Sequence, residues 1–529
     1  MQHNQSQSPT TPQWGARRWL WPSIAAMGVA GAMALGWWRT SYGPAVGPDG
    51  VMYLETAESL LAGRGLWADG VPMTHYGPGY PLLLAIAALV QGEGVFESSR
   101  WLHTSLLGLN ALLLGQAVRA STGRSVLAGV LAMLLLLTCE PAVRAHHTIA
   151  SEALFVALML AGLLLLSRSL RSGGHWSLLF GAASLGLAMA TRYAGVALLA
   201  PLLLTLLAHP STRQRPLLAL PALVLTCSPL GLWLARNALI GGTATNRALF
   251  YHPPNSGYLT DFARALHGLL LSVEVPGWLE ALGLVLVTGL IAGALAMLHR
   301  RRPLIAVARK QPLALLWLAF ALAYTIVLAA TRTFVDAQTP ADSRILLPLW
   351  MALVVIIISL AYAVSQATGK RAFWWALVLV SVVAIGINGT YTWERSRSWH
   401  RNGSRYSGKT WRRSPTIAAV SCLPTGTIVY SNGYDVIRFL TNHEALTVPR
   451  HTNPNSLQPY PDYAGKLEAM CQAAATGRGV VVYLREVTWR DYMPDREAIV
   501  DACELSVLQE LDDGIIYGSA DARLDQTLR

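Results

Sequence analysis

The sequence predicts a polytopic α-helical membrane protein with a small C-terminal α/β domain, and three observations support this fold class. The 529-residue chain is 53% hydrophobic and only 13% charged, whereas soluble domains carry roughly 25% charged residues. Long apolar runs with few charges fill residues 18–390, and about 20 apolar residues span the core of a bilayer. Residues 391–529 have the composition of a soluble domain. We therefore expect a membrane domain over 18–390 and a soluble domain after it.

The N-terminal segment combines a polar tail with a first membrane helix. Residues 1–17 are rich in Gln, Ser, Thr and Pro, a composition typical of a disordered tail. Arg17 and Arg18 then precede the apolar stretch 19–37. A signal peptide has a similar charged start but a shorter apolar region. We therefore favour an uncleaved first membrane helix over a signal peptide.

Apolar runs predict about eleven membrane helices, and the charged loops between them predict their orientation. The helices are expected at 18–37, 100–118, 125–139, 150–168, 176–190, 193–208, 216–235, 277–298, 313–330, 345–366 and 373–390. Alternate loops carry the basic groups Arg17/Arg18, Arg119/Arg124, Arg168/Arg171, Arg213/Arg215, Arg300–Arg302 with Arg309/Lys310, and Lys370/Arg371. The positive-inside rule places these loops and the N-terminus in the cytoplasm, and an odd number of spans places the C-terminal domain outside. The net charge of +12 is thereby explained by topology, without a nucleic-acid partner.

The loops on the opposite side hold the His, aromatic and mixed charged residues, so we expect this outer face to be the functional one. The first of these loops covers residues 38–99 and contains "YGPGYPLLLAIAALV" at 76–90. That stretch is short for a span and is better interpreted as a helix lying in the membrane interface. The other outer segments include "EPAVRAHHTIASE" and residues 236–276.

The C-terminal domain alternates strand-like and helix-like segments, which predicts an α/β fold. Strands are expected at 427–432, 479–484 and 514–519, and helices at "DVIRFLTN" and "YAGKLEAMCQAAA". The domain has neither of the glycine-rich nucleotide-binding motifs. The chain has five cysteines, Cys139, Cys227, Cys422, Cys471 and Cys503. Their spacing does not suggest a zinc site, and the pairing of the last three is left open.

Asp49 is the first candidate for a catalytic residue. It lies in "GPDG" just after the first apolar segment, at the start of an amphipathic run. A purely structural interpretation is that Asp49 caps the helix beginning near Val51, since Asp is a good N-cap. A functional interpretation is that the turn holds a carboxylate at the lipid–water boundary. Position alone does not decide between them.

Two further groups of residues are candidates for binding. Glu140, His146, His147 and Glu152 cluster in one short outer loop, with a spacing that is weak for a metal site. An acid near the start of the following helix is also favoured by the helix dipole. The second group comprises the outer helix-end arginines Arg192, Arg236 and Arg344. They are either interfacial residues that reach the headgroups or phosphate ligands, since a guanidinium binds phosphate bidentately.

The order of several motifs resembles the GT-C superfamily of membrane glycosyltransferases, in the bacterial branch with the protein-mannosyltransferase and aminoarabinose-transferase type domain. The motifs are "PDGVMYLETAESLLAGRGL", "HYGPGYPLLLA", "HHTIASEALFVALML", "TRYAGVALLAPLL", "LARNALIGG", "DSRILLPLW" and "IVYSNGYDVIRFLTNHEALTVP". There are two departures from the family pattern: Glu152 stands where many members have Asp, and "YGPGYP" lacks the usual Pro-Pro pair.

The resemblance implies a catalytic role for Asp49 and binding roles for the other candidates. Asp49 would be the catalytic base. Arg344, with Arg192 and Arg236, would bind the donor phosphate, and substrate positioning would involve Tyr53, His75, Tyr76, His146, His147 and Glu152. These roles fit the chemistry of sugar transfer, because an attacking hydroxyl needs a base and a departing phosphate needs fixed positive charge. Some GT-C enzymes use a divalent metal ion and others use none, so the metal requirement is left open.

The expected function is transfer of a sugar from a polyprenyl-phosphate donor to a cell-envelope acceptor (a lipid, glycan or protein) at the outer face of the bacterial cytoplasmic membrane, with inversion. Two alternatives are a non-catalytic transporter or scaffold for lipid-linked sugars and an O-antigen ligase or polymerase. A transporter more often has polar or broken helices at mid-membrane, whereas here the ionisable residues crowd at the outer helix ends.

Overall fold

The computed structural model describes residues 14–209, 216–253, 256–273 and 312–519, apart from the single positions 442, 454 and 491, together with the isolated positions 289 and 296. Several predictions lie wholly or mostly outside these residues. They are the disordered tail over 1–17, the membrane helix over 277–298 and the basic groups at 213–215 and 300–310.

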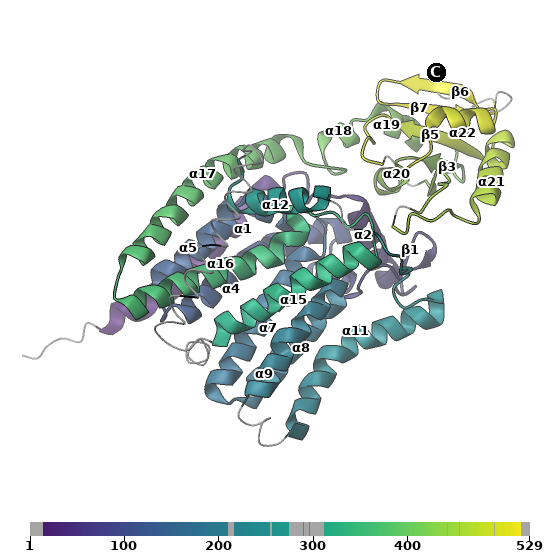
Figure 1. Ribbon diagram of the computed structural model, residues 1–529. Helices are drawn as coiled ribbons and strands as arrows, with labels where there is room; N and C mark the ends of the chain where they lie inside the picture. Colours follow the sequence, from purple (N-terminus) through teal and green to yellow (C-terminus); the bar gives the residue numbers. More distant parts are fainter. Residues whose placement is uncertain are drawn as a thin grey trace, which may run out of the picture.

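Long apolar helices packed side by side make up the larger part of the molecule (Figure 1). Every membrane helix that the sequence predicts within the described residues has a counterpart. These are α1 (Trp14–Arg39), α4 (Val95–Ser121), α5 (Val126–Thr138), α7 (Glu152–Ser172), α8 (His175–Thr191), the 3-10 turn Tyr193–Leu198 with α9 (Leu199–Ala208), α11 (Ala219–Gly241), α15 (Pro312–Phe334), α16 (Ser343–Thr368) and α17 (Ala372–Asn402).

The number of complete membrane spans is smaller than the number of apolar helices. Among the described residues, six helices are long and apolar enough to cross a membrane, or up to eight if each of two bent pairs is one span. Helices such as α5, with 13 residues, and α9, with 10 residues, are shorter than the roughly 20 residues that a bilayer core requires at 1.5 Å per residue. Length and composition therefore do not establish the predicted count of eleven.

The centre of the bundle is packed with large apolar side chains, and small residues allow close helix contacts. Trp317 and Phe320 on α15 and Trp350 on α16 are buried in one cluster. Where α8 crosses α11, a Cβ at Gly186 would collide with the carbonyl oxygen of Leu225. Small residues let helix backbones approach closely in membrane bundles, so this packing holds the helix ends that carry the site.

The first long loop, residues 38–99, folds into short elements at one end of the bundle. It contains α2 (Pro48–Leu61), a hairpin of β1 (Trp67–Ala68) and β2 (Val71–Pro72), and α3 (Gly79–Gln91). The helix predicted over 76–90 is present as α3, which is bent by 103° from α4. Pro48 occupies the first turn of α2 and Asp49 follows it there, and both residue types suit a helix start.

Two segments predicted as loops contain helices. Residues Glu140–His146 form α6, with a proline at its start, and Ser256–Leu270 form α12. The prediction was wrong at α6 because seven residues are too few for a recognisable helical period. It was wrong at α12 because this helix is amphipathic and lacks the continuous apolar run that marks a membrane helix.

The C-terminal region contains a five-stranded sheet in the order β4-β3-β5-β7-β6. The strands are β3 (Ile428–Ser431), β4 (Ala445–Thr447), β5 (Gly479–Leu484), β6 (Ser506–Leu511) and β7 (Gly514–Gly518). β4, β3 and β5 are parallel, and β7 and β6 are antiparallel to their neighbours. The helices are α18 (Lys409–Arg412), α19 (Pro415–Ser421), α20 (Tyr434–Leu440), α21 (Tyr463–Ala475) and α22 (Arg496–Ala502). A disulfide joins Cys471 to Cys503.

This sheet lies next to α2 and β1 at one end of the bundle (Figure 1), and specific contacts fasten it there. Arg438 on α20 forms ion pairs with Glu55 on α2 and Asp69 in the hairpin turn. The backbone N–H of Tyr406 donates to the carbonyl of Val46 at 3.1 Å. The start of α2 is thereby enclosed between the helical bundle and the C-terminal region.

Candidate functional site

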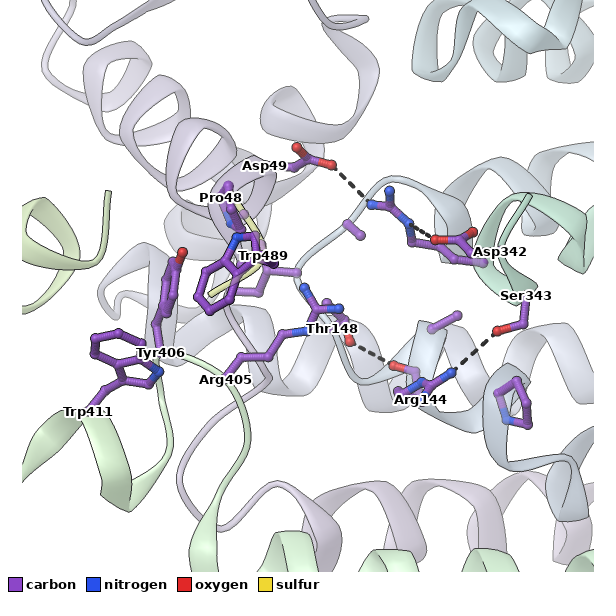
Figure 2. A pocket seen from close by; sticks show the side chains of 17 residues that line it. Pro48, Asp49, Arg144, Thr148, Asp342, Ser343, Arg405, Tyr406, Trp411 and Trp489 are labelled. Atoms are coloured by element: carbon purple, nitrogen blue, oxygen red, sulfur yellow. Dashed lines mark hydrogen bonds and ion pairs between the residues drawn. The ribbon is translucent and has the colours of Figure 1, made fainter. Parts of the chain in front are cut away.

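A cavity of about 610 Å³ opens where these parts meet. Its walls come from four segments: the start of α2, α6 with the residues after it, the start of α16, and the C-terminal region (Figure 2). Its polar lining includes three arginines and two aspartates, which are Arg144, Arg344, Arg405, Asp49 and Asp342. The cavity therefore gathers charges from parts of the chain that are distant in sequence.

Asp49 is held by two donors at the edge of this cavity. Its Oδ2 lies 3.0 Å from Nη1 of Arg344, and its Oδ1 accepts a hydrogen bond from the hydroxyl of Tyr76 at 2.9 Å. Burial opposes ionisation, but the charge of Arg344 and these hydrogen bonds outweigh it and hold the pKa of Asp49 below its ordinary value. Of the two interpretations of Asp49, capping of α2 does not hold, because the N-cap is Gly47 and the Asp49 carboxylate accepts from Arg344 and Tyr76.

Arg344 contacts acids from three segments. Besides Asp49, its Nε lies 3.2 Å from Oε1 of Glu152 and 3.7 Å from Oδ2 of Asp342. Asp342 is the N-cap of α16 and accepts the backbone N–H of Ile345 at 2.8 Å. The cap fixes the first turn of α16, so the guanidinium of Arg344 is aimed at Asp49 and Glu152.

Glu152 and Arg192 extend this arrangement into a chain of alternating charges. Glu152 is only 1% exposed, and its Oε1 lies 2.6 Å from Nη1 of Arg192. Arg192 also donates to Oγ of Ser151 at 3.1 Å. The predicted phosphate ligand Arg192 is thus already paired with a buried acid, and it does not line the cavity.

Tyr53 and His75 support the side of Asp49 away from Arg344. The ring of Tyr53 lies 5.0 Å from the ring of Tyr76, and the Tyr53 hydroxyl is 3.4 Å from Oγ of Ser151. His75 packs edge-on against Tyr76, and its Nε2 lies 3.3 Å from Nη2 of Arg247. Burial and the charge of Arg247 lower the pKa of His75 to about 4. His75 is therefore neutral at physiological pH and positions Tyr76 without adding charge.

The histidines predicted to line the site are buried in the bundle. Nδ1 of His146 donates to the carbonyl of Ala142, and its Nε2 accepts a hydrogen bond from Nδ2 of Asn110, both at 2.8 Å. His147 is fully buried as well. Neither histidine lines the cavity, because both side chains are buried among the helices. The substrate-positioning role expected for them is not supported by this geometry.

Glu140 and Arg236 also have structural partners. Glu140 forms a buried bidentate ion pair with Arg39 at 2.8 and 2.9 Å. Arg236 donates to the carbonyls of Met73 at 2.6 Å and Leu66 at 3.4 Å, so it fastens the hairpin segment instead of facing the cavity. Within the described part of the chain, no group of three His, Cys, Asp or Glu residues is placed to hold a metal ion.

The cavity residues from α6 and the C-terminal region are not among the candidates predicted from the sequence. Arg144, Arg405, Tyr406, Trp411 and Trp489 all line the cavity, and Figure 2 shows Trp489 beside Pro48. Two of them carry a sequence signal, since Arg144 and Arg405 lie on the predicted outer side, where arginines are less expected. For the three aromatic residues the sequence offered no comparable signal.

Comparisons with known proteins agree with this architecture. Residues 75–235 match the family described as dolichyl-phosphate-mannose-protein mannosyltransferase. ArnT from Cupriavidus metallidurans in the apo state has a similar structure, with a TM-score of 0.58 and 14% identity over 95% of this chain and 98% of that chain. Its structure bound to undecaprenyl phosphate gives a TM-score of 0.56 and 14% identity over 94% of this chain and 99% of that chain.

A larger protein shares the fold as well. The arabinofuranosyltransferase AftD from Mycobacteria has a TM-score of 0.51 and 14% identity, covering 96% of this chain and 40% of that chain. No curated protein sequence matches the chain.

Proposed function

Because the chain has the GT-C fold, of the bacterial type seen in ArnT, we propose that it is a membrane glycosyltransferase that moves a sugar from a polyprenyl-phosphate donor to a cell-envelope acceptor. The observation that carries this proposal is the Asp49–Arg344 pair at the edge of a polar cavity. It combines an ionised carboxylate with fixed positive charge, and transfer from a phosphate leaving group needs both.

The proposed reaction is a single displacement at the anomeric carbon. The acceptor hydroxyl attacks that carbon while its proton passes to the Asp49 carboxylate. The bond between the anomeric carbon and the phosphate oxygen breaks, and its electron pair stays on polyprenyl phosphate. Attack from the side opposite the leaving group inverts the anomeric configuration.

The other predicted site residues have narrower roles in this proposal. Tyr76 orients Asp49 through its hydrogen bond, and Tyr53 and His75 support Tyr76. Glu152 and Arg192 hold Arg344 in place. Arg344 is the one predicted arginine that lines the cavity, and it contributes charge at the phosphate end. Arg236 fastens the hairpin segment and is not part of the phosphate site.

We further propose that the site faces the outside of the bacterial cytoplasmic membrane, with the N-terminus in the cytoplasm and eleven spans in total. The loop charges support this orientation. A disulfide within the C-terminal region also supports it, since disulfides persist mainly outside the cytoplasm. On this proposal the membrane domain covers 18–390 and the outer domain 391–529.

The sugar and the acceptor are best identified in a deletion strain. Loss of the gene should cause a polyprenyl-phosphate sugar to accumulate and one envelope modification to disappear, as analysed by mass spectrometry of extracted lipids and glycans. Complementation with the wild-type chain should reverse both changes, and complementation with Asp49→Asn should reverse neither. If Asp49→Asn restored the modification fully, a transporter or scaffold would explain the phenotype better than an enzyme.

A further inference from the structure

Two arginines of the cavity lack an acidic partner among the described residues. The guanidinium of Arg144 donates to the neutral hydroxyl of Ser343 at 3.3 Å. The guanidinium of Arg405 makes neither a hydrogen bond nor an ion pair in the described part of the chain, although it lines the cavity. By contrast, Arg344 and Arg192 are each paired with a carboxylate within 3.2 Å. Arg144 and Arg405 are therefore free to bind an anion.

Arg405 is held in position by its backbone. Its φ of 51° lies in the left-handed region, which non-glycine residues adopt rarely and mostly where surrounding contacts impose it. The imposing contacts are the pairing of Arg405 with Val46 and the hydrogen bond from Ser407 Oγ to the carbonyl of Pro44 at 2.8 Å. The segment carrying Arg405 is thus fixed against the chain that leads into α2.

Space for the Arg405 guanidinium is provided by a glycine. A Cβ at Gly47 would lie 2.6 Å from Nη1 of Arg405, which is too close for an unmoved side chain. The guanidinium therefore lies over the backbone of Gly47, two residues before Asp49. In Figure 2 Arg405 and Arg144 point into the same cavity as Asp49 and Asp342.

The proposed reaction creates negative charge, so it needs positively charged side chains that are not already paired with an acid. A sugar linked to polyprenyl phosphate is a phosphodiester with one negative charge, and cleavage leaves a monoester whose charge approaches −2 near neutral pH. The charge of Arg344 is already balanced by Asp49 and Glu152. A fixed positive charge that is not already paired with an acid stabilises the developing negative charge on the phosphate best.

We propose that Arg144 and Arg405 form a phosphate subsite that holds the polyprenyl phosphate leaving group and stabilises the charge it gains as the glycosidic bond breaks. This inference rests on the proposed glycosyltransferase function. It adds the two arginines to the phosphate end of the site, where Arg344 contributes charge but is already paired with Asp49 and Glu152. The subsite should bind the product, polyprenyl phosphate, more strongly than the donor.

The test measures equilibrium binding of undecaprenyl phosphate and of undecaprenol, which lacks the phosphate, to the purified full-length protein in detergent. The variants are Arg144→Gln, Arg405→Gln and Arg405→Lys, with Arg413→Gln as a matched control. Arg413 is exposed in the same region but does not line the cavity. Both Gln variants should lose about tenfold in affinity for undecaprenyl phosphate, the scale of one charge-assisted hydrogen bond. Undecaprenol binding and the control should not change, and Arg405→Lys should retain part of the affinity.

The outcomes separate this inference from the proposed function. If the wild-type protein does not prefer undecaprenyl phosphate to undecaprenol, the proposed donor itself is wrong. If the wild type shows the preference and both folded Gln variants keep it, the function stands and the subsite is wrong. If the variants keep that preference but show a raised KM for the acceptor, the arginines bind an acceptor anion, and the assignment to the leaving group is overturned.

Discussion

Nη1 of Arg344 lies 3.0 Å from Oδ2 of Asp49, although 295 positions separate the two residues in the chain. The contact joins the first turn of α2 to the first turn of α16. Because α16 is packed into the centre of the bundle, it gives a rigid support to the guanidinium that orients the carboxylate in the first turn of α2. The same contact keeps the carboxylate ionised, which is the state a general base requires.

Replacing Asp49 by Asn should remove the chemical step while leaving donor binding largely intact. Asn has nearly the same shape but cannot accept the proton of the acceptor hydroxyl, and a positioned base contributes typically 10²–10⁴-fold. Turnover measured with a defined polyprenyl-phosphate sugar should fall by a factor in about that range. Glu58→Gln, an exposed change on the same helix, is the control and should behave like the wild type. Full turnover in Asp49→Asn would remove Asp49 from catalysis.

Removing the charge of Arg344 should shift the pH dependence of the reaction. The pKa of Asp49 is raised by burial and lowered by Arg344 and Tyr76, with a net decrease. In Arg344→Gln the main lowering influence is lost, so the pKa of Asp49 should rise. Since the active form of Asp49 is the carboxylate, the acidic limb of the pH profile of kcat/KM should move to higher pH. Turnover at neutral pH should fall by about 10²–10³-fold. Arg344→Lys keeps the charge but not the planar fork, so it should show a smaller shift. An unchanged acidic limb in Arg344→Gln would show that Asp49 is not the titrating base.

The ion pair between Arg438 and Glu55 should stabilise the contact of the C-terminal region with α2. Arg438 is 11% exposed and Glu55 is 23% exposed, so solvent screens this pair less than a surface pair. Arg438→Gln should accelerate proteolytic release of the C-terminal region and lower transfer activity, because that region supplies part of the cavity wall. In a double-mutant cycle with Glu55→Gln, the effects of the two substitutions on the stability of the docked C-terminal region should couple by about 0.5–3 kcal/mol. Strict additivity would mean that the pair does not contribute to docking.

Trp489 should contribute to binding of the sugar more than to the chemical step. It is 49% exposed and lines a cavity that otherwise has many charged groups, so its indole face is available to the apolar side of a sugar ring. Trp489→Ala should raise the KM of the sugar donor about threefold to tenfold, corresponding to the ~0.5–1.5 kcal/mol of an aromatic face contact, with kcat nearly unchanged. Trp375→Ala, an exposed tryptophan on α17 outside the cavity, is the control. A loss confined to kcat would argue against this contact.

The sequence predicted the helical bundle well because a membrane helix is a local property. A continuous apolar run of sufficient length folds as a helix whatever its neighbours are, and α7 and α16 follow their predicted ranges closely. Strands β5 and β7 were also predictable from the local sequence, because each is a short apolar run bounded by turn residues. Elements with weaker local patterns, such as α6, were missed.

The candidate site was predicted in part, because its residues come from distant segments. Asp49 and Arg344 were recognised separately from their positions, but their contact depends on how α2 meets α16. His146 and His147 were expected at the site because they lie in a polar segment between two helices, but both are buried and do not line the cavity. Arg405 lies on the predicted outer side, but its place in the cavity depends on the backbone pairing with Val46, which the sequence does not reveal.

The C-terminal region should be oxidised and accessible only from outside the cytoplasm. Cys471 and Cys503 form a disulfide, whereas Cys422 is free and exposed in the same region. In intact spheroplasts a membrane-impermeant maleimide should label Cys422 at once, and it should label Cys471 and Cys503 only after reduction and unfolding. A Cys422→Ser variant controls for labelling elsewhere. Replacing both disulfide cysteines by Ser should destabilise the region by about 3–4 kcal/mol, the chain entropy of closing a loop of 32 residues, and this should appear as faster proteolysis of the C-terminal region. Labelling of Cys422 only after the membrane is permeabilised would place the region in the cytoplasm, and the cavity at the end of the bundle with it.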